Sequence, residues 1–281
     1  MSLADLAVEH GLHRVGARPR FWQYLKQAWG RREFVWAMSK YRMSADLEGN
    51  RLGVFWLVLQ PVLNATIYGV IFYFLQEGRR PPDYAAHVVI GVFLFQFFSK
   101  SLSNGAKSIT GNQALVQSLA FPRITLPVGE VIEQFLSLLP SMAFLLILLP
   151  FMGNWPKWEW LLMIPLLTLF TLFNTGVALI AARLTVHVRD LTQLLPFVSR
   201  ILFYTSGVLF DVSRILSEHP VLVRLYDFHP LYQVLQIARA CLMRGHDYNP
   251  MYWVYFSTWA ILTFVLGLLF FWVAEERYGR D

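Results

Sequence analysis

Residues 127–150 read PVGEVIEQFLSLLPSMAFLLILLP, an apolar run whose only charged side chains are Glu130 and Glu133. A helix rises about 1.5 Å per residue, so it crosses the hydrocarbon core of a bilayer with about 20 apolar residues. Five further runs meet or approach that length: 52–75, 85–103, 160–182, 191–210 and 251–274. The sequence therefore predicts an all-α integral membrane protein with six transmembrane helices.

The composition agrees with this fold class. Hydrophobic residues make up 56% of the chain and charged residues 15%, unlike the balance of a soluble domain. We expect three parts: a cytoplasmic N-terminal region (1–51), a six-helix transmembrane domain (52–274) and a short cytoplasmic tail (275–281). The single cysteine, Cys241, excludes an intrachain disulfide.

The distribution of Lys and Arg predicts the orientation, because cytoplasmic loops carry an excess of both. Six spans place both termini on one side. That side carries fifteen Lys and Arg residues outside the spans, nine of them in the first 51 residues, against seven on the other side. Both termini are therefore expected in the cytoplasm. We read the net charge of +6 as this topology signal and expect no nucleic-acid partner.

Residues 21–43 are predicted to form an amphipathic helix at the membrane surface. Trp22, Leu25, Trp29 and Trp36 fall on one stripe, and five basic residues surround it. Aromatic rings at headgroup level with cations facing anionic lipid are typical of an interfacial helix. Packing against a partner protein is the alternative, and the two are compatible.

The longest predicted cytoplasmic connection, 104–126, contains a short exposed helix over 113–119. Glu130 and Glu133 follow it in the first turns of the third span. Carboxylates inside a membrane are costly, which suggests a gate or a proton relay. A structural role is the alternative, since both lie near the cytoplasmic end and near a helix N-terminus, within reach of water or Arg123.

Residues 211–250 form the long outer segment, and its apolar runs are too short to span a membrane. They include 221–223 and 231–242, separated by His229-Pro230. Such runs indicate re-entrant or interfacial helices before the last span. Arg200 is the most deeply placed cation, so we expect it to face a protein interior or a watery path.

No catalytic or metal-binding motif is present. The seven His residues lack metal-ligand spacing. Gly105-Ala106-Lys107-Ser108 departs from the phosphate-loop pattern in its glycine spacing and lacks its Gly-Lys pair. We expect neither an enzyme nor a cofactor or metal on this chain.

Aromatic residues are abundant, with 23 Phe, 12 Tyr and 10 Trp. Most membrane aromatics face lipid or form interfacial belts. The alternative is a conduit wall on which sugar rings stack. The channel-lining candidates are Phe55, Trp56, Tyr68, Phe72, Phe203 and Tyr204, together with Arg200.

Several motifs occur in a recognisable order. They are Tyr41-Arg42, then Leu52-Gly53 with Trp56 and Pro61, then Asn112 with Leu115 and Val116, then Phe121-Pro122-Arg123 with Leu126-Pro127, and finally Arg189-Asp190. In this order the chain resembles the permease subunits of ABC-2 type polysaccharide exporters over about 50–275. His229-Pro230 stands where that family commonly has Asn-Pro.

The resemblance implies a permease homodimer that works with two copies of a separate ATPase, which binds ATP and Mg and hydrolyses the ATP. The cargo would be a polysaccharide such as galactan, O-antigen or teichoic acid on a polyprenyl diphosphate lipid, exported across a bacterial plasma membrane. The implied ATPase-coupling residues are Asn112, Leu115, Val116, Phe121, Pro122 and Arg123. The candidates for binding the lipid diphosphate are Arg31, Arg32, Lys40, Arg42 and Arg51, whose alternative role is ordinary positive-inside charge.

Three other functions remain open. An ABC-2 exporter of drugs or small lipids shares the six spans. A proton-coupled secondary transporter would use Glu130, Glu133 and Arg200, although the sequence lacks an inverted repeat. A membrane-embedded glycosyltransferase would need clustered acidic residues, which are absent.

Overall fold

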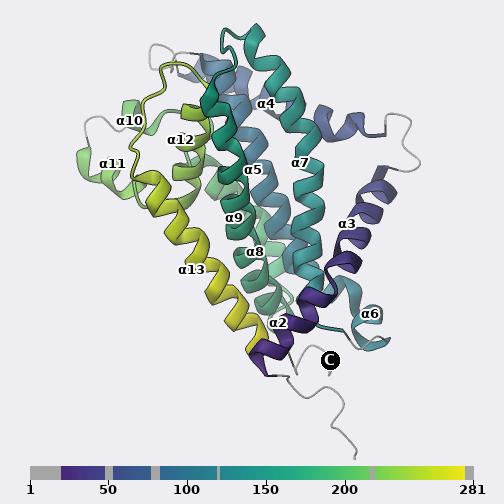
Figure 1. Cartoon of the computed structure of the whole chain (residues 1–281). Helices are drawn as coiled ribbons and strands as arrows, with labels where there is room; N and C mark the ends of the chain where they lie inside the picture. The colour runs from purple at the N-terminus through teal and green to yellow at the C-terminus, as the bar shows by residue number, and fades with distance from the viewer. Residues whose placement is uncertain (1–19, 48–52, 77–82, 119–120, 216–218, 276–281) are drawn as a thin grey trace, which may run out of the picture.

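The computed structural model describes residues 20–47, 53–76, 83–118, 121–215 and 219–275, and all regular structure in these ranges is helical (Figure 1). Five helical segments are long and apolar enough to cross a membrane. They are α4 (Phe55–Leu75), α5 (Tyr84–Lys107), α7 (Thr125–Phe151), η2 with α8 (Trp158–Leu162 and Met163–His187) and α13 (Tyr252–Val273). The all-α membrane fold is confirmed.

The predicted sixth run, 191–210, is helical only over α9 (Leu191–Thr205). Fifteen residues extend about 22 Å, which is short of the hydrocarbon thickness of about 30 Å. The chain leaves the helix through Gly207, whose φ of 70° is open mainly to glycine. A sixth full span therefore stays a prediction.

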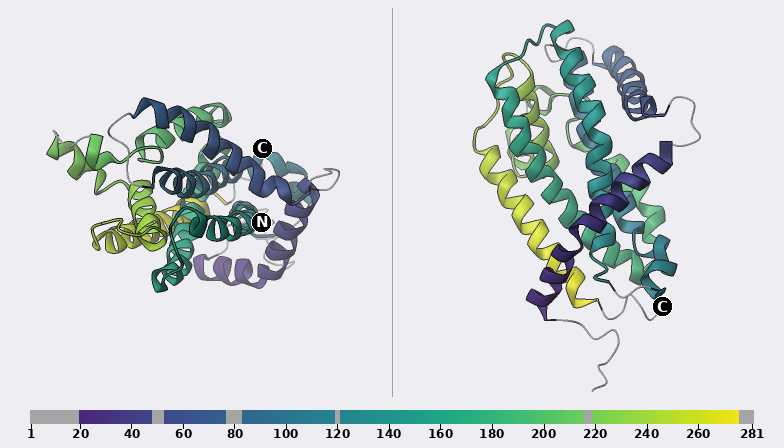
Figure 2. Two further views of the ribbon diagram at one scale, coloured as in Figure 1. Left: turned by 90° about the horizontal axis from the view of Figure 1, so that it is seen from above. Right: turned by 45° about the vertical axis from the view of Figure 1, so that its right-hand side comes forward.

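Helix α5 is the centre of the bundle and contacts α4, α7, α8, α9 and α12 (Figure 2). In its most apolar window 72% of the residues are buried, against 11% for α4. Helices α8 and α13 pack closely at Gly176 and Gly267, which face each other. A Cβ on Gly176 would lie 2.4 Å from the Thr263 backbone, so only glycine permits this approach.

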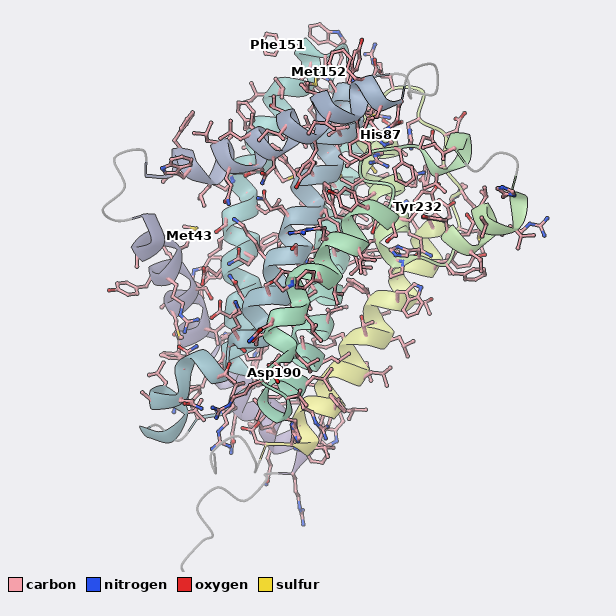
Figure 3. All side chains as sticks on the ribbon, turned by 180° about the vertical axis from the view of Figure 1, so that it is seen from behind. Met43, His87, Phe151, Met152, Asp190 and Tyr232 are labelled. Carbon is pink, nitrogen blue, oxygen red and sulfur yellow. The ribbon has the colours of Figure 1, made fainter. Side chains whose placement is uncertain are left out.

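Helix α4 is steeply inclined to its neighbours (Figures 1 and 3), and its first turn lies beside the middle of α7. Pro61 lacks an N–H, which leaves the carbonyl of Leu57 without its helical donor. The Ser141 hydroxyl of α7 supplies that donor at 2.7 Å. This bond pins the proline-containing turn of α4 to α7.

The predicted surface helix is two helices, α2 (Phe21–Gly30) and α3 (Arg32–Leu47), which break at Arg31. Trp22, Trp29 and Trp36 are exposed, whereas Tyr24 is buried. Helix α3 leans on the half of α7 nearer to α6 (Gln113–Ser118). The end of the bundle that holds α6, Asp190 and residue 275 is called the α6 end below (Figures 1 and 3).

Toward the opposite end lie the short helices α10 (Val212–Ile215), α11 (Pro220–Tyr226) and α12 (Pro230–Leu242). Every residue of α12 after Pro230 is buried, as a re-entrant helix requires. His229 caps its N-terminus, because the ring Nδ1 accepts a hydrogen bond from Tyr232 N at 3.2 Å. Lys157 donates to the carbonyls of Ala240 and Met243, at 2.7 and 2.9 Å, and so caps the other end.

Candidate functional site

A groove of about 350 Å³ lies between α4, α5 and α9. Most of its wall is polar or aromatic, although each helix that forms it is predominantly apolar. The lining residues are Asn64, Tyr68, Val92, Phe95, Gln96, Ser99, Lys100, Ser103, Pro196, Ser199, Arg200 and Phe203.

Aromatic rings form one wall of this groove. Phe203 lies 5.0 Å from Tyr68 and 5.1 Å from Phe95, measured between ring centroids. Farther along the same helices, Tyr204 stacks on Phe72 at 6.4 Å and 25°. These contacts bring four of the predicted channel-lining residues together. The other two aromatic candidates, Phe55 and Trp56, lie exposed in the first turn of α4, away from the groove.

Two cations line the groove, and the described residues that line it include no acidic side chain. Lys100 Nζ donates to Gln60 Oε1 at 3.1 Å, which orients its ammonium toward α4. The Arg200 side chain projects from α9 and is exposed. The groove therefore combines aromatic rings with amides and hydroxyls and carries positive charge.

A second group of contacts ties the N-terminal helices to the α5–α7 connection. Arg42 of α3 is paired with Glu130 of α7, and its Nη2 donates to Asn112 Oδ1 at 2.9 Å. The Asn112 amide in turn donates to the Ser108 carbonyl at 2.8 Å. Ser39 Oγ donates to the Gly129 carbonyl at 2.8 Å. Helix α3 is thus fixed both to α7 and to the segment that carries α6.

The end of α13 joins the same region through Glu275. Tyr24 OH donates to Glu275 Oε2 at 2.7 Å and accepts from Ile124 N at 3.2 Å. Arg123 donates to Glu275 Oε1 through its backbone N at 3.0 Å and to the Glu275 carbonyl through its guanidinium. Burial raises the pKa of the Glu275 carboxyl, against the lowering effect of Arg123 and Tyr24.

Residues 33–243 match the family described as ABC-2 type transporter. The chain belongs to this family. Its relatives include two proteins of Klebsiella pneumoniae named O-antigen export system permease protein RfbA. The first is 28% identical over 235 residues, covering 83% of this chain and 88% of that protein. The second is 26% identical over 229 residues, covering 81% and 86%. A Myxococcus xanthus protein of the same name is 26% identical over 183 residues, covering 65% and 70%.

Membership confirms the family resemblance read from the sequence and implies an ABC ATPase partner for this integral membrane protein.

The predicted coupling residues fall into two groups. Asn112, Leu115 and Val116 lie in the segment that follows α5, but Val116 points inward and is buried. Phe121 packs against Phe34 of α3, with ring centroids 6.4 Å apart, and Pro122 is buried. The exposed side of the segment instead contains Lys107, Gly111, Gln113 and Ala114.

The sequence placed Glu130 and Glu133 within reach of water or Arg123, and the structure pairs Glu130 with Arg42. Arg123 lies seven residues before Glu130 in sequence, but its hydrogen bonds are to Glu275 at the end of α13. Glu133 is buried and accepts from Gln134 Nε2 at 3.3 Å. Both carboxylates therefore have partners within the protein.

The candidates for diphosphate binding differ in their accessibility. Arg31, Arg32 and Lys40 are exposed. Arg32 also lies 5.8 Å over the Trp29 ring and 3.7 Å from Glu33. Arg42 is occupied by Glu130 and Asn112, and Arg51 lies outside the described residues.

Sequence reasoning missed Arg239, which is fully buried in α12. Its Nη2 donates to the carbonyls of Gly207 and Val208 at 2.9 Å each, and to that of His87 at 3.3 Å. Gly91 provides the space, since a Cβ there would lie 2.9 Å from this nitrogen. Arg239 thereby ties the chain leaving α9 to α5 and α12. A charged residue inside the apolar run 231–242 was the available signal.

Proposed function

We propose that this chain is the membrane permease of an ATP-driven exporter of a lipid-linked cell-envelope polysaccharide, such as an O-antigen, galactan or teichoic acid. The observation that carries the proposal is the groove between α4, α5 and α9. Its aromatic rings suit the C–H faces of sugars, and its amides and hydroxyls suit their hydroxyl groups. The names of the relatives support a polysaccharide cargo.

The groove is open on one side, and a second copy of the chain would close it. Helices α4 and α9 both turn apolar side chains outward beside it. The exposed residues include Leu63, Ile67, Val70, Phe197 and Ile201. A twofold pairing would bury these faces and join two grooves into one conduit. The polymer would pass between the two permease copies.

The segment 107–114 would contact the ATPase in the cytoplasm, with both termini on that side and one ATPase for each permease copy. Asn112 lies within this segment, and its side chain accepts a hydrogen bond from Arg42 of α3. A push on this segment would therefore move α3 and α7 as well as α5. Rigid-body motion of this kind is a standard way to open a path across a protein.

The surface helices would hold the lipid end of the cargo. Trp22, Trp29 and Trp36 present aromatic surface suited to headgroup depth, beside the exposed cations Arg31, Arg32 and Lys40. Cations at a membrane surface attract a lipid diphosphate. Arg42 would instead transmit motion, because Glu130 already neutralises it.

The test is co-purification with the ABC ATPase encoded beside this chain, followed by ATPase measurement in lipid nanodiscs with and without lipid-linked polysaccharide. We expect a two-plus-two complex whose ATPase rate responds to the polymer. Gly111→Trp should weaken this complex, because a Cβ at Gly111 has open space and the added ring would project toward the partner. Val221→Trp, on exposed α11 toward the opposite end, is the matched control.

A complex stimulated by small amphiphiles and indifferent to polymer would favour a drug or small-lipid exporter. A chain that transports under a proton gradient without an ATPase would favour secondary transport. The partners that Glu130 and Glu133 already have within the protein argue against the second alternative.

A further inference from the structure

We infer that Arg183 of α8 and Phe270 of α13 form a binding site for the phosphate of an anionic phospholipid, in the leaflet at the α6 end. The site shares no residue with the groove between α4, α5 and α9. It involves only α8 and α13, and it does not depend on the proposed function.

The first step is the depth of the site. The segment Trp158–His187 has 30 residues and α13 has 22, so they extend about 45 and 33 Å and both can cross a hydrocarbon core of about 30 Å. Arg183 lies four residues before the end of α8, and Phe270 lies three residues before the end of α13. Both are therefore within about 6 Å of the helix ends, where hydrocarbon gives way to headgroups.

The second step is the position of Arg183 between the two helices. Gly176 of α8 packs against the backbone of α13, and Arg183 follows it by seven residues, which places it on the same face. The close contact at Gly176 leaves no room for a side chain. Toward the helix ends the interface admits the Arg183 side chain, which remains partly exposed.

The third step is the fixed orientation of the guanidinium. Its Cζ lies 3.7 Å from the centre of the Phe270 ring, and Nη1 donates to the Phe270 carbonyl. Within the described ranges neither ion pair involves Arg183. A guanidinium carries five N–H donors in a planar fork that matches phosphate oxygens. The contacts with Phe270 hold this fork in place and leave donors for a phosphate, which lowers the entropy cost of binding.

The fourth step is the apolar surface around the cation. Exposed apolar side chains flank it on both helices: Leu184 and Val188 on α8, and Leu269 and Val273 on α13. A ligand that fits must therefore combine a negative charge with hydrocarbon chains. Free phosphate lacks the chains. A zwitterionic phospholipid has both parts, but its own cation competes with Arg183 for the phosphate. An anionic phospholipid satisfies both requirements.

A lipid bound here would also act on the end of α13. Glu275, two residues after α13 ends, accepts hydrogen bonds from Tyr24 of α2 and from the backbone N of Arg123. Fixing the last turn of α13 at Phe270 would steady these contacts. We therefore expect the anionic lipid to stabilise the fold as well as to bind.

The experiment titrates the full chain in detergent with lipids and counts the bound molecules by native mass spectrometry. We expect dioleoyl phosphatidylglycerol to bind its first site at least fivefold more tightly than dioleoyl phosphatidylcholine. Arg183→Gln should reduce this preference about fivefold, the usual effect of one cation at an anionic membrane surface. Arg189→Gln, at an exposed cation in the turn after α8, is the matched control and should leave the preference unchanged.

Two more variants separate a built site from simple surface charge. Arg183→Lys keeps the charge without the planar fork, and Phe270→Leu keeps an apolar side chain without the ring. Each should weaken binding of phosphatidylglycerol about two- to fivefold, as expected for the loss of a cation–π contact or of a paired hydrogen bond. Wild-type affinity in both variants would show that charge alone suffices and would reject the site.

Competitors distinguish the sources of phosphate. Displacement of phosphatidylglycerol by an equal concentration of glycerol 3-phosphate would show that the acyl chains contribute nothing. Tighter binding of undecaprenyl diphosphate, lost in Arg183→Gln, would assign the site to a polyprenyl lipid. Either result would overturn a phospholipid site. Equal affinity for the two phospholipids, or an unchanged preference in Arg183→Gln, would overturn it as well.

Thermal unfolding provides a second readout and checks that each variant is folded. Phosphatidylglycerol should raise Tm of the wild-type chain and of Arg189→Gln, but not of Arg183→Gln. An equal rise in all three would contradict the site. These measurements need neither ATP nor polymer, so their failure leaves the proposed function untouched, and failure of export leaves the lipid site untouched.

Discussion

Replacing Arg42 by Gln removes the charge that links α3 to α7 while keeping a polar side chain of similar length. The Arg42 and Glu130 side chains are 23% and 12% exposed, so this ion pair is partly buried. Hydrogen bonds to charged groups contribute about 1.5–3 kcal/mol each. We therefore expect Arg42→Gln and Glu130→Gln each to cost about 2 kcal/mol, with the double variant costing about 1.5 kcal/mol less than their sum.

The assay measures thermal unfolding through the protein's own cysteine. Cys241 is the only cysteine in the sequence and is buried in α12, so a thiol-reactive fluorophore labels it when the chain unfolds. A loss of 2 kcal/mol should lower Tm by about 4–8 °C. The control is Arg32→Gln in the same helix, because its pair with Glu33 is exposed and such pairs contribute under about 1 kcal/mol. Equal shifts for Arg42→Gln and Arg32→Gln, or single-variant losses that add up to that of the double variant, would show that the Arg42–Glu130 pair does not stabilise the protein.

Two further predictions use the same assay, and a third follows unfolding by tryptophan fluorescence, because a thiol reagent needs the thiolate and reacts slowly at acid pH. Gly176→Ala should lower Tm by several degrees more than Gly30→Ala, because only the first new Cβ meets the backbone of α13; equal shifts would contradict the close packing. Arg239→Met leaves three backbone carbonyl groups without their donor. It should destabilise the protein by about 3 kcal/mol, far more than Arg224→Met. A neutral result would show that the hydrogen bonds of Arg239 to these carbonyls do not stabilise the fold. Burial lowers the pKa of His246 to about 4 from its ordinary value of 6.5, with a smaller contribution from Arg239. The unfolded chain then binds more protons, so stability should fall as pH drops from 6.5 toward 4, and His246→Gln should flatten this dependence.

Much of the fold follows from local patterns. Of the six apolar runs predicted to span the membrane, five correspond to long helices, and the short runs around a His-Pro pair correspond to the buried helix α12. The sequence predicted a single helix over 21–43, but the break at Arg31 depends on how α2 and α3 pack on different parts of the bundle. The early end of α9 depends on a positive φ at Gly207, which hydropathy does not record.

The site was less accessible to sequence reasoning, because its contacts join distant segments. Arg42 reaches Glu130 across 88 positions, whereas proximity in sequence suggested only water or Arg123 for this carboxylate. The aromatic residues of α4 and α9 were predicted to line a path, but the polar residues of α5 that complete the groove were not. Gln96, Ser99 and Lys100 read as ordinary polar positions near the end of an apolar run. Whether these residues contact a polymer stays a prediction.

Transport itself is the most direct test of ATP-driven export by this chain. The chain and its ATPase are reconstituted in proteoliposomes with the ATPase facing the bath, lipid-linked polysaccharide is supplied in the outer leaflet, and the polymer protected from an added glycosidase is measured. We predict that protection appears only with ATP and both subunits, and that a proton gradient does not replace ATP. Protection driven by the proton gradient alone, or no protection under ATP with an intact two-plus-two complex, would contradict ATP-driven polysaccharide export.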